Sequence, residues 1–140
     1  MRVVAADFFG RGLFGCLASK VPLAGVKDCL GDPDDVSIQK RPIEILKYGN
    51  VQIHCGVVGV VLIVVSLWSR ELPIHPRVEF EGWDALWECG LVNFQAAMSS
   101  LCVWCVVNPA LTFGDQRAFV VGGSVNAVFV DDMIDRVELF

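Results

Sequence analysis

Two pairs of polar side chains lie in long apolar stretches at spacings that place each pair on one face of a helix. Asn50 and His54 are four residues apart, and Glu88 and Gln95 are seven apart, two helical turns. Imidazole nitrogens and amide or carboxylate oxygens can ligate a metal ion such as Mg²⁺. The same groups can instead hydrogen-bond to a neighbouring helix or to water. Metal ligation and structural hydrogen bonding therefore remain alternative interpretations of both pairs.

The sequence carries little that indicates catalysis. Cys102 and Cys105 have the spacing of a thiol redox pair or of half a zinc site, but no second such pair accompanies them. A glycine-rich phosphate loop, a serine nucleophile elbow and an HExxH motif are all absent. The six cysteines are spread along the chain, several within apolar runs, and do not indicate a disulfide framework. We therefore expect a protein that is not an enzyme.

The first polar pair lies in the longest uncharged stretch, residues 48–68. About 21 residues at about 1.5 Å each give roughly 30 Å as a helix, the thickness of a bilayer's hydrocarbon core. The stretch ends in Trp68, Ser69 and Arg70, a pattern typical of a lipid-water boundary. A strand buried on both faces of a parallel sheet is the alternative, but buried strands rarely exceed about ten residues. The length therefore predicts a first transmembrane helix over 48–68.

Two further apolar runs predict the rest of the membrane domain. Residues 86–107 are long enough to span and stop at Asn108-Pro109. Residues 118–130 are short for a span, which favours a short membrane-embedded helix. Residues 1–41 are expected to form an N-terminal surface segment. Within it, residues 1–25 are either amphipathic on the membrane surface or the remnant of an organelle-targeting sequence, and residues 26–41 are a polar connector. The predicted fold is a single all-α membrane domain, 1–140, with two transmembrane helices and a short third helix.

Composition agrees with a membrane protein and argues against nucleic acid. Hydrophobic residues make up 54% of the chain and charged residues 19%, which is more apolar than an ordinary soluble domain. The formal net charge is −5, and no basic tract is present. Lys40, Arg41 and Lys47 precede the first predicted span and favour a cytoplasmic, stromal or matrix location for that end.

Residues 41–56, the dipeptide Gly82-Trp83 and residues 114–123 together resemble the light-harvesting chlorophyll a/c-binding antenna family. Residues 41–56, RPIEILKYGNVQIHCG, are similar to the family's first-helix signature, with Lys47 and Gly49 in matching positions. Gly82-Trp83 resembles the Gly-Trp that opens the family's middle helix. Residues 114–123, GDQRAFVVGG, are similar to part of the third helix and retain Arg117.

The resemblance implies pigment binding, with departures at the positions that carry it. In the family, Glu-Arg pairs cross-link the first and third helices, and each Glu also ligates a chlorophyll. Here Ile45 stands at the acidic position of the first helix, with Glu44 displaced by one, and Asn50 stands at its arginine position. Thr112 replaces the acidic residue of the third helix, so both pairs cannot form. The implied ligands of chlorophyll and carotenoid, with no metal beyond chlorophyll magnesium, are Glu44, Asn50, His54, Glu88 and Gln95.

The sequence thus predicts a small antenna-like subunit of a photosystem in the chloroplast thylakoid membrane. Such a subunit would pass excitation energy onward, and its partners would be lipids and a larger membrane-protein complex. The alternative prediction is a pigment-poor accessory transmembrane subunit. That subunit would stabilise a photosystem, or a respiratory complex in the mitochondrial inner membrane.

Overall fold

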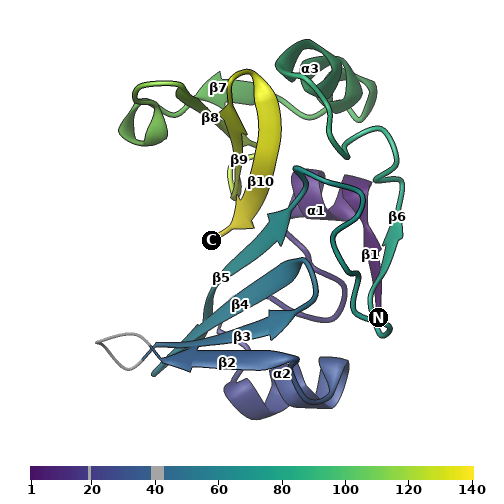
Figure 1. Ribbon diagram of the computed structural model, residues 1–140, viewed down its shortest axis with the longest axis vertical. Coiled ribbons are helices and arrows are strands. Elements are labelled where there is room, and N and C mark those ends of the chain that lie inside the picture. Colours follow the sequence, from purple (N-terminus) through teal and green to yellow (C-terminus); the bar gives the residue numbers. More distant parts are fainter. Residues whose placement is uncertain (19, 39–42) are drawn as a thin grey trace.

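One bent antiparallel sheet of eight strands forms the frame of the molecule (Figure 1). The computed structural model describes residues 1–18, 20–38 and 43–140. The strands lie in the order β2-β3-β4-β5-β10-β9-β8-β7, and the β2–β5 half is steeply inclined to the β7–β10 half (Figure 1). Their bounds are Asp35–Ile38 (β2), Glu44–Tyr48 (β3), Val51–Gly56 (β4), Gly59–Ser66 (β5), Cys105–Val107 (β7), Gln116–Val121 (β8), Val125–Val130 (β9) and Met133–Leu139 (β10).

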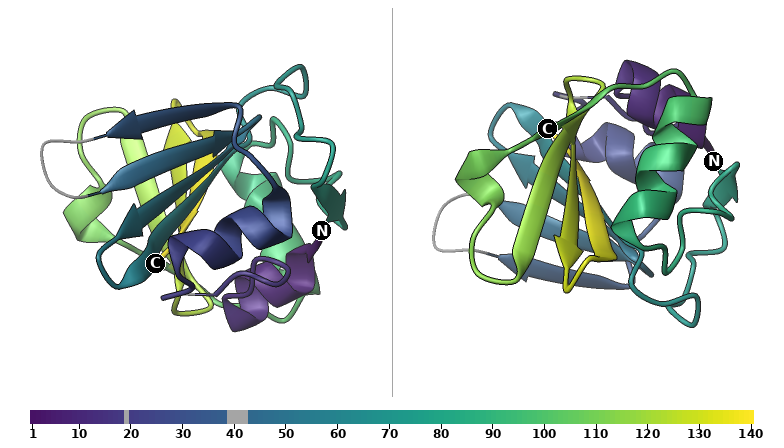
Figure 2. Two further views of the ribbon diagram at one scale, coloured as in Figure 1. Left: turned by 90° about the horizontal axis from the view of Figure 1, so that it is seen from below. Right: turned by 90° about the horizontal axis from the view of Figure 1, so that it is seen from above.

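Short elements complete the fold. Strands β1 (Arg2–Val4) and β6 (Glu79–Glu81) form a separate parallel pair. The helices are α1 (Ala5–Arg11), α2 (Leu23–Leu30) and α3 (Leu91–Ser100), with a 3₁₀ turn, η1 (Pro109–Leu111), after β7. The three α-helices gather on one side of the sheet (Figure 2).

The core lies between these helices and one face of the sheet. Its centre is aromatic, because Phe8 and Phe9 of α1 pack against Trp83 at ring-centroid distances of 5.1 and 5.4 Å. The Trp83 indole is fully buried and donates a hydrogen bond to the carbonyl of Val3. Phe94 of α3 extends the cluster to Phe129 of β9. The N-terminal residues predicted to lie on a membrane surface therefore supply part of the protein core instead.

Two-residue turns connect β3 to β4 and β9 to β10. Gly49, with φ 58°, takes the first central position of the β3–β4 turn, where a type II′ hairpin requires a positive φ. Asp131 and Asp132 both have positive φ in the β9–β10 turn, as a type I′ hairpin requires. Short connections of this kind make strands that follow one another pair antiparallel. Strands β5 and β10 are distant in the chain and also pair antiparallel.

The predicted first span, 48–68, is wrong as a helix and forms strands β4 and β5. The chain reverses at Val57-Val58, and the following Gly59 has φ 106°; a Cβ there would lie 2.5 Å from the Lys20 carbonyl oxygen. Burial alternates strictly along β4, the period of a strand. The run is rich in valine, whose branched side chain packs well in a sheet.

The other two predicted membrane helices are also replaced. Residues 86–107 divide into a turn, the ten-residue helix α3 and strand β7. Residues 118–130 form most of the β8–β9 hairpin, which turns at Gly122-Gly123-Ser124. Across the described residues, no helix combines the length and apolar character needed to cross a membrane.

These findings overturn the all-α fold class and what depended on it. The predicted antenna-like or accessory transmembrane subunit needs membrane-spanning helices where the chain has strands. The predicted locations in the thylakoid or mitochondrial inner membrane rested on the same helices and are corrected with them. Lys40 and Arg41, which were predicted to flank the first span, lie outside the described residues.

Candidate functional site

A pocket lies where two segments pair along one edge of β5 and leave a gap between them. Strand β10 pairs with β5 as far as Leu139, opposite Ile63. Beyond that point Lys20 donates to the Val60 carbonyl, and the Val60 amide donates to the Val21 carbonyl, both at 2.8 Å. The intervening part of β5, Val61 and Leu62, lines a pocket of about 290 Å³.

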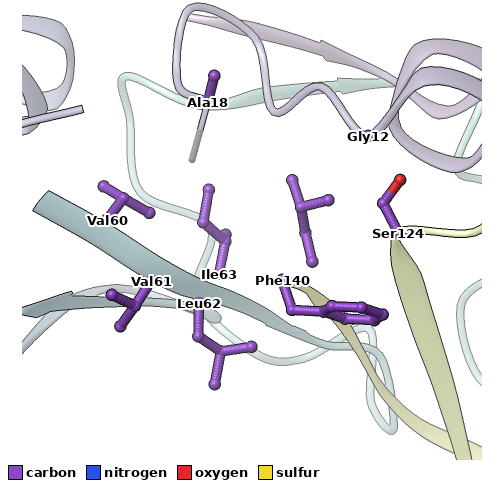
Figure 3. Close-up of a pocket in the computed structure, with 9 residues that line it drawn as sticks. Gly12, Ala18, Val60, Val61, Leu62, Ile63, Ser124 and Phe140 are labelled. Carbon is purple, nitrogen blue, oxygen red and sulfur yellow. The ribbon is translucent and has the colours of Figure 1, made fainter. Parts of the chain in front are cut away.

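The pocket is lined mostly by apolar side chains (Figure 3). Val60 and Ile63 extend from β5 into the space below Ala18, and the Ser124 hydroxyl lies next to Gly12 (Figure 3). No side chain that lines the pocket is charged. The pocket can therefore hold an apolar molecule and offer it one hydroxyl group. The lining residues are Gly12, Ala18, Val60, Val61, Leu62, Ile63, Ser124, Leu139 and Phe140.

Glycine at position 12 allows the close approach that forms one wall of the pocket. Gly12 ends α1 in the left-handed conformation with φ 65°, which favours glycine. A Cβ at this position would lie 2.9 Å from the Ser124 hydroxyl oxygen. Any other residue would therefore strain the helix end and push against the β8–β9 turn.

The structure separates Asn50 and His54, which the sequence placed on one helix face. Four residues along a strand span about 13 Å, whereas one helical turn would bring the pair together. Asn50 is 4% exposed in the β3–β4 turn and donates to the Ser66 carbonyl at 3.2 Å. His54 lies in β4, opposite Ile45 and Leu62. Among the described residues, neither the Asn50 Oδ1 nor the His54 Nε2 has a hydrogen-bond partner.

The remaining predicted ligands also lie apart. Glu44 begins β3, opposite Cys55. Glu88 precedes α3 with φ 53° and accepts a hydrogen bond from the Arg70 amide at 2.9 Å, while Gln95 is exposed on α3. Glu88 and Gln95 therefore do not share a helix face. The described part of the chain contains no group of three or more His, Cys, Asp or Glu side chains placed to hold a metal ion.

The sheet face opposite the core carries a charged cluster that the sequence did not indicate. Arg136 forms ion pairs with Asp135 and with Glu138, where its Nε lies 2.7 Å from Oε1 of Glu138. Burial lowers the pKa of Arg136, but the hydrogen bonds and charges of Glu138 and Asp135 outweigh burial and raise it. Burial lowers the pKa of nearby His54, and the charge of Glu138 opposes that effect. The carboxylates already neutralise Arg136, so the cluster does not offer a free cation to a ligand.

Two of the six cysteines form a disulfide that the sequence did not predict. Cys16 and Cys29 form a disulfide that connects the chain after α1 to α2, although the sequence did not indicate a framework. Cys102 and Cys105 are free, with Cys102 exposed and Cys105 half-buried in β7. Burial raises the pKa of the Cys105 thiol, which disfavours the reactive thiolate. A redox role for these two cysteines gains no support from this geometry.

Sequence reasoning missed the pocket because its walls are distant in the chain. Gly12, Ala18, β5, Ser124 and the end of β10 meet only after the sheet has formed. The one local signal was Gly122-Gly123-Ser124, a turn sequence inside an apolar run.

Comparison with known proteins supports the fold. No family model and no curated protein matches the chain. The fold is similar to the crystal structure of YjgB, a DUF4309 family protein from Bacillus subtilis subsp. subtilis str. 168, with a TM-score of 0.54 and 14% sequence identity. The match covers 96% of this chain and 90% of YjgB. At this identity the likeness concerns the fold alone, and it does not test the predicted resemblance to the antenna family.

Proposed function

We propose that this chain is a binding domain, without catalytic activity, that holds a small and mainly apolar ligand in the pocket beside β5. The observation that carries the proposal is the gap between β10 and the Lys20–Val21 segment, which leaves Val61 and Leu62 beside an apolar pocket. Apolar walls with few polar groups are typical of small-molecule sites. The Ser124 hydroxyl supplies the polar contact and fixes the ligand's orientation.

The size of the pocket limits the ligand. Its volume of about 290 Å³ is roughly twice that of an engineered 150 Å³ cavity that accepts benzene. A ligand of roughly ten non-hydrogen atoms fits this space. Because no lining side chain can neutralise a charge, a charged ligand would lose its hydration without compensation. An alcohol with a short alkyl chain is therefore a suitable probe.

The test is a titration of the protein with 1-octanol, followed by NMR of the valine and leucine methyl groups. Small ligands gain roughly 0.6 kcal/mol per non-hydrogen atom, so nine such atoms correspond to a Kd of about 0.1 mM. We expect saturable shifts at Val60 and Leu62 with 1-octanol and much weaker binding of octanoate.

Two matched variants locate the binding. Ala18→Leu adds a side chain at the pocket wall and should weaken 1-octanol binding at least tenfold. Ala24→Leu makes the same change at an exposed position of α2 and should leave binding unchanged. Equal binding by both variants, or no saturable shift in the unmodified protein, would refute the proposal.

Binding of chlorophyll or carotenoid and membership of a larger assembly stay predictions from the sequence. A visible absorption spectrum of the protein purified from its native source tests the first, and co-purification tests the second. Pigment bands that disappear in a His54→Leu variant would identify that side chain as a ligand.

A further inference from the structure

The two edges of the sheet differ in charge. At the β2 edge, Asp35 forms an ion pair with Lys47 at 2.9 Å. At the other edge, β7 lies within a stretch that has no charged residue between Glu88 and Asp115. Proteins protect exposed edge strands with charges, bulges, proline or a very short strand, because the free backbone groups of an edge can pair with another strand. Among the described residues the β7 edge carries no charge and no bulge, so only its short length and Pro109 limit pairing.

The backbone of β7 presents hydrogen-bonding groups to the outside of the sheet. The Trp104 carbonyl accepts from Gly122 at 3.1 Å, and the Asn108 amide donates to Ala118 at 2.8 Å, so these residues face β8. Successive residues of a strand direct their backbone groups to opposite sides. Cys105 and Val107 therefore direct their N–H and C=O groups away from β8, where the sheet ends.

Apolar side chains flank these free groups. Trp104 is 55% exposed, Val106 57% and Val107 54%. The strand is short because Cys102 on one side has φ 57° and Pro109 on the other has no N–H. A pairing strand must therefore be equally short and apolar.

We propose that two copies of this chain associate through antiparallel pairing of their β7 strands around a two-fold axis at Val106. In this register Cys105 lies opposite Val107 of the partner subunit, and the outward N–H and C=O groups of both residues form four hydrogen bonds across the axis. The stretch is self-complementary, as a two-fold interface requires. Each copy has a formal net charge of −5, so an uncharged edge is where two copies approach with least repulsion. This inference does not depend on ligand binding in the pocket.

The experiment is sedimentation equilibrium of the full chain over a range of concentrations. We expect a reversible dimer, and backbone amide exchange at Cys105 and Val107 that slows as the dimer forms. Val107→Pro removes one outward N–H without removing a bond to β8 and should raise the dimer Kd at least tenfold. Val107→Lys should do the same by adding like charges at the interface.

Val92→Lys is the matched control, since Val92 is 77% exposed and lies in the first turn of α3, outside β7. This variant should dimerise like the unmodified chain. A monomer at all concentrations would overturn the proposal, as would a dimer that resists both Val107 variants or that Val92→Lys also disrupts. Non-reducing electrophoresis provides the last check, because a dimer linked covalently through Cys102 would also refute strand pairing.

Discussion

Tyr48 reports on the packing between β3 and the end of α2. Its side chain is fully buried, and its hydroxyl donates to the Gly31 carbonyl at 3.0 Å. Burial, followed by the negative charges of Cys55, Asp32 and Asp34, raises the pKa of Tyr48 to about 12. Folding therefore favours the neutral hydroxyl of Tyr48. The stability of the folded protein that depends on this neutral form is fully present below the unfolded-state pKa of about 10, and it is lost as pH rises toward about 12.

Because Tyr48 is the only tyrosine in the chain, ultraviolet absorbance of tyrosinate measures its ionisation directly. After a rapid pH jump the folded protein should ionise near pH 12, and the denatured protein near pH 10. Ionisation of the folded protein near pH 10 would show that the side chain is solvated.

His54 should make the fold sensitive to mild acid. Burial lowers its pKa below the ordinary value of 6.5. As pH falls below about 6.5, His54 binds a proton in the unfolded chain while it is still neutral in the folded protein. The free energy of unfolding therefore decreases from about pH 6.5 down to the folded-state pKa. Denaturant unfolding at several pH values should show that acidification lowers the free energy of unfolding less in His54→Gln than in the unmodified protein.

The role of Glu138 can be separated by NMR. Its charge raises the pKa of His54 against the effect of burial, so Glu138→Gln should move the His54 titration to a still lower pH. An unchanged titration would contradict this electrostatic contact.

The sequence identified His54 as unusual but placed it beside the wrong residues. The four-residue spacing of Asn50 and His54 places the two side chains close together in a helix but far apart in a strand. The spacing alone therefore does not say whether they are neighbours. Glu138 is 84 positions from His54 in sequence, and β4 and β10 are brought near each other by β5. No local pattern contains that contact.

The β8–β9 hairpin requires glycine at position 122. Its φ is 58°, and a Cβ there would lie 2.0 Å from the Phe9 carbonyl oxygen in α1. Gly122→Ala should therefore reduce the free energy of unfolding by more than about 2 kcal/mol, since a left-handed conformation alone costs a non-glycine residue about 1–2 kcal/mol. Equilibrium denaturation in urea measures the loss.

Gly114 supplies the matched control. It has nearly the same φ, 55°, but a Cβ would meet nothing within 4 Å. Gly114→Ala should therefore reduce the free energy of unfolding only by the cost of the left-handed conformation. Equal losses at the two positions would show that the approach of α1 to the hairpin does not restrict Gly122.

Turn glycines explain why two of the predicted helices, 48–68 and 118–130, were wrong. Residues 48–68 and 118–130 each hold two strands with a turn between them, and Gly59 and Gly122-Gly123 mark those turns. Length favoured a membrane helix because Val57 and Val58 continue the apolar run through the first turn, although they are exposed. Glycine is also common in transmembrane helices, so these residues did not exclude a helix.

The apolar composition of the chain favoured a membrane protein, but part of this apolar content lies on the surface of the folded protein. Ile38 is 77% exposed, Val57 86% and Phe113 64%. An apolar fraction of 54% is therefore compatible with a sheet covered by helices. The pairing of β5 with β10 joins segments that are distant in the chain, and a single sequence does not encode such a pairing in any local period.

The Cys16–Cys29 disulfide is another contact of the whole molecule, and its effect is largely on the unfolded chain. The two cysteines are 13 positions apart, and closing a loop of this length removes conformational entropy worth about 3 kcal/mol from the unfolded state. Reduction should therefore lower the free energy of unfolding by about 3 kcal/mol in urea denaturation. The double variant Cys16→Ala/Cys29→Ala should match the reduced protein and no longer respond to reductant, whereas Cys102→Ala should respond like the unmodified chain. If reduction destabilises the double variant as much as the unmodified protein, the bond that stabilises the fold involves other cysteines.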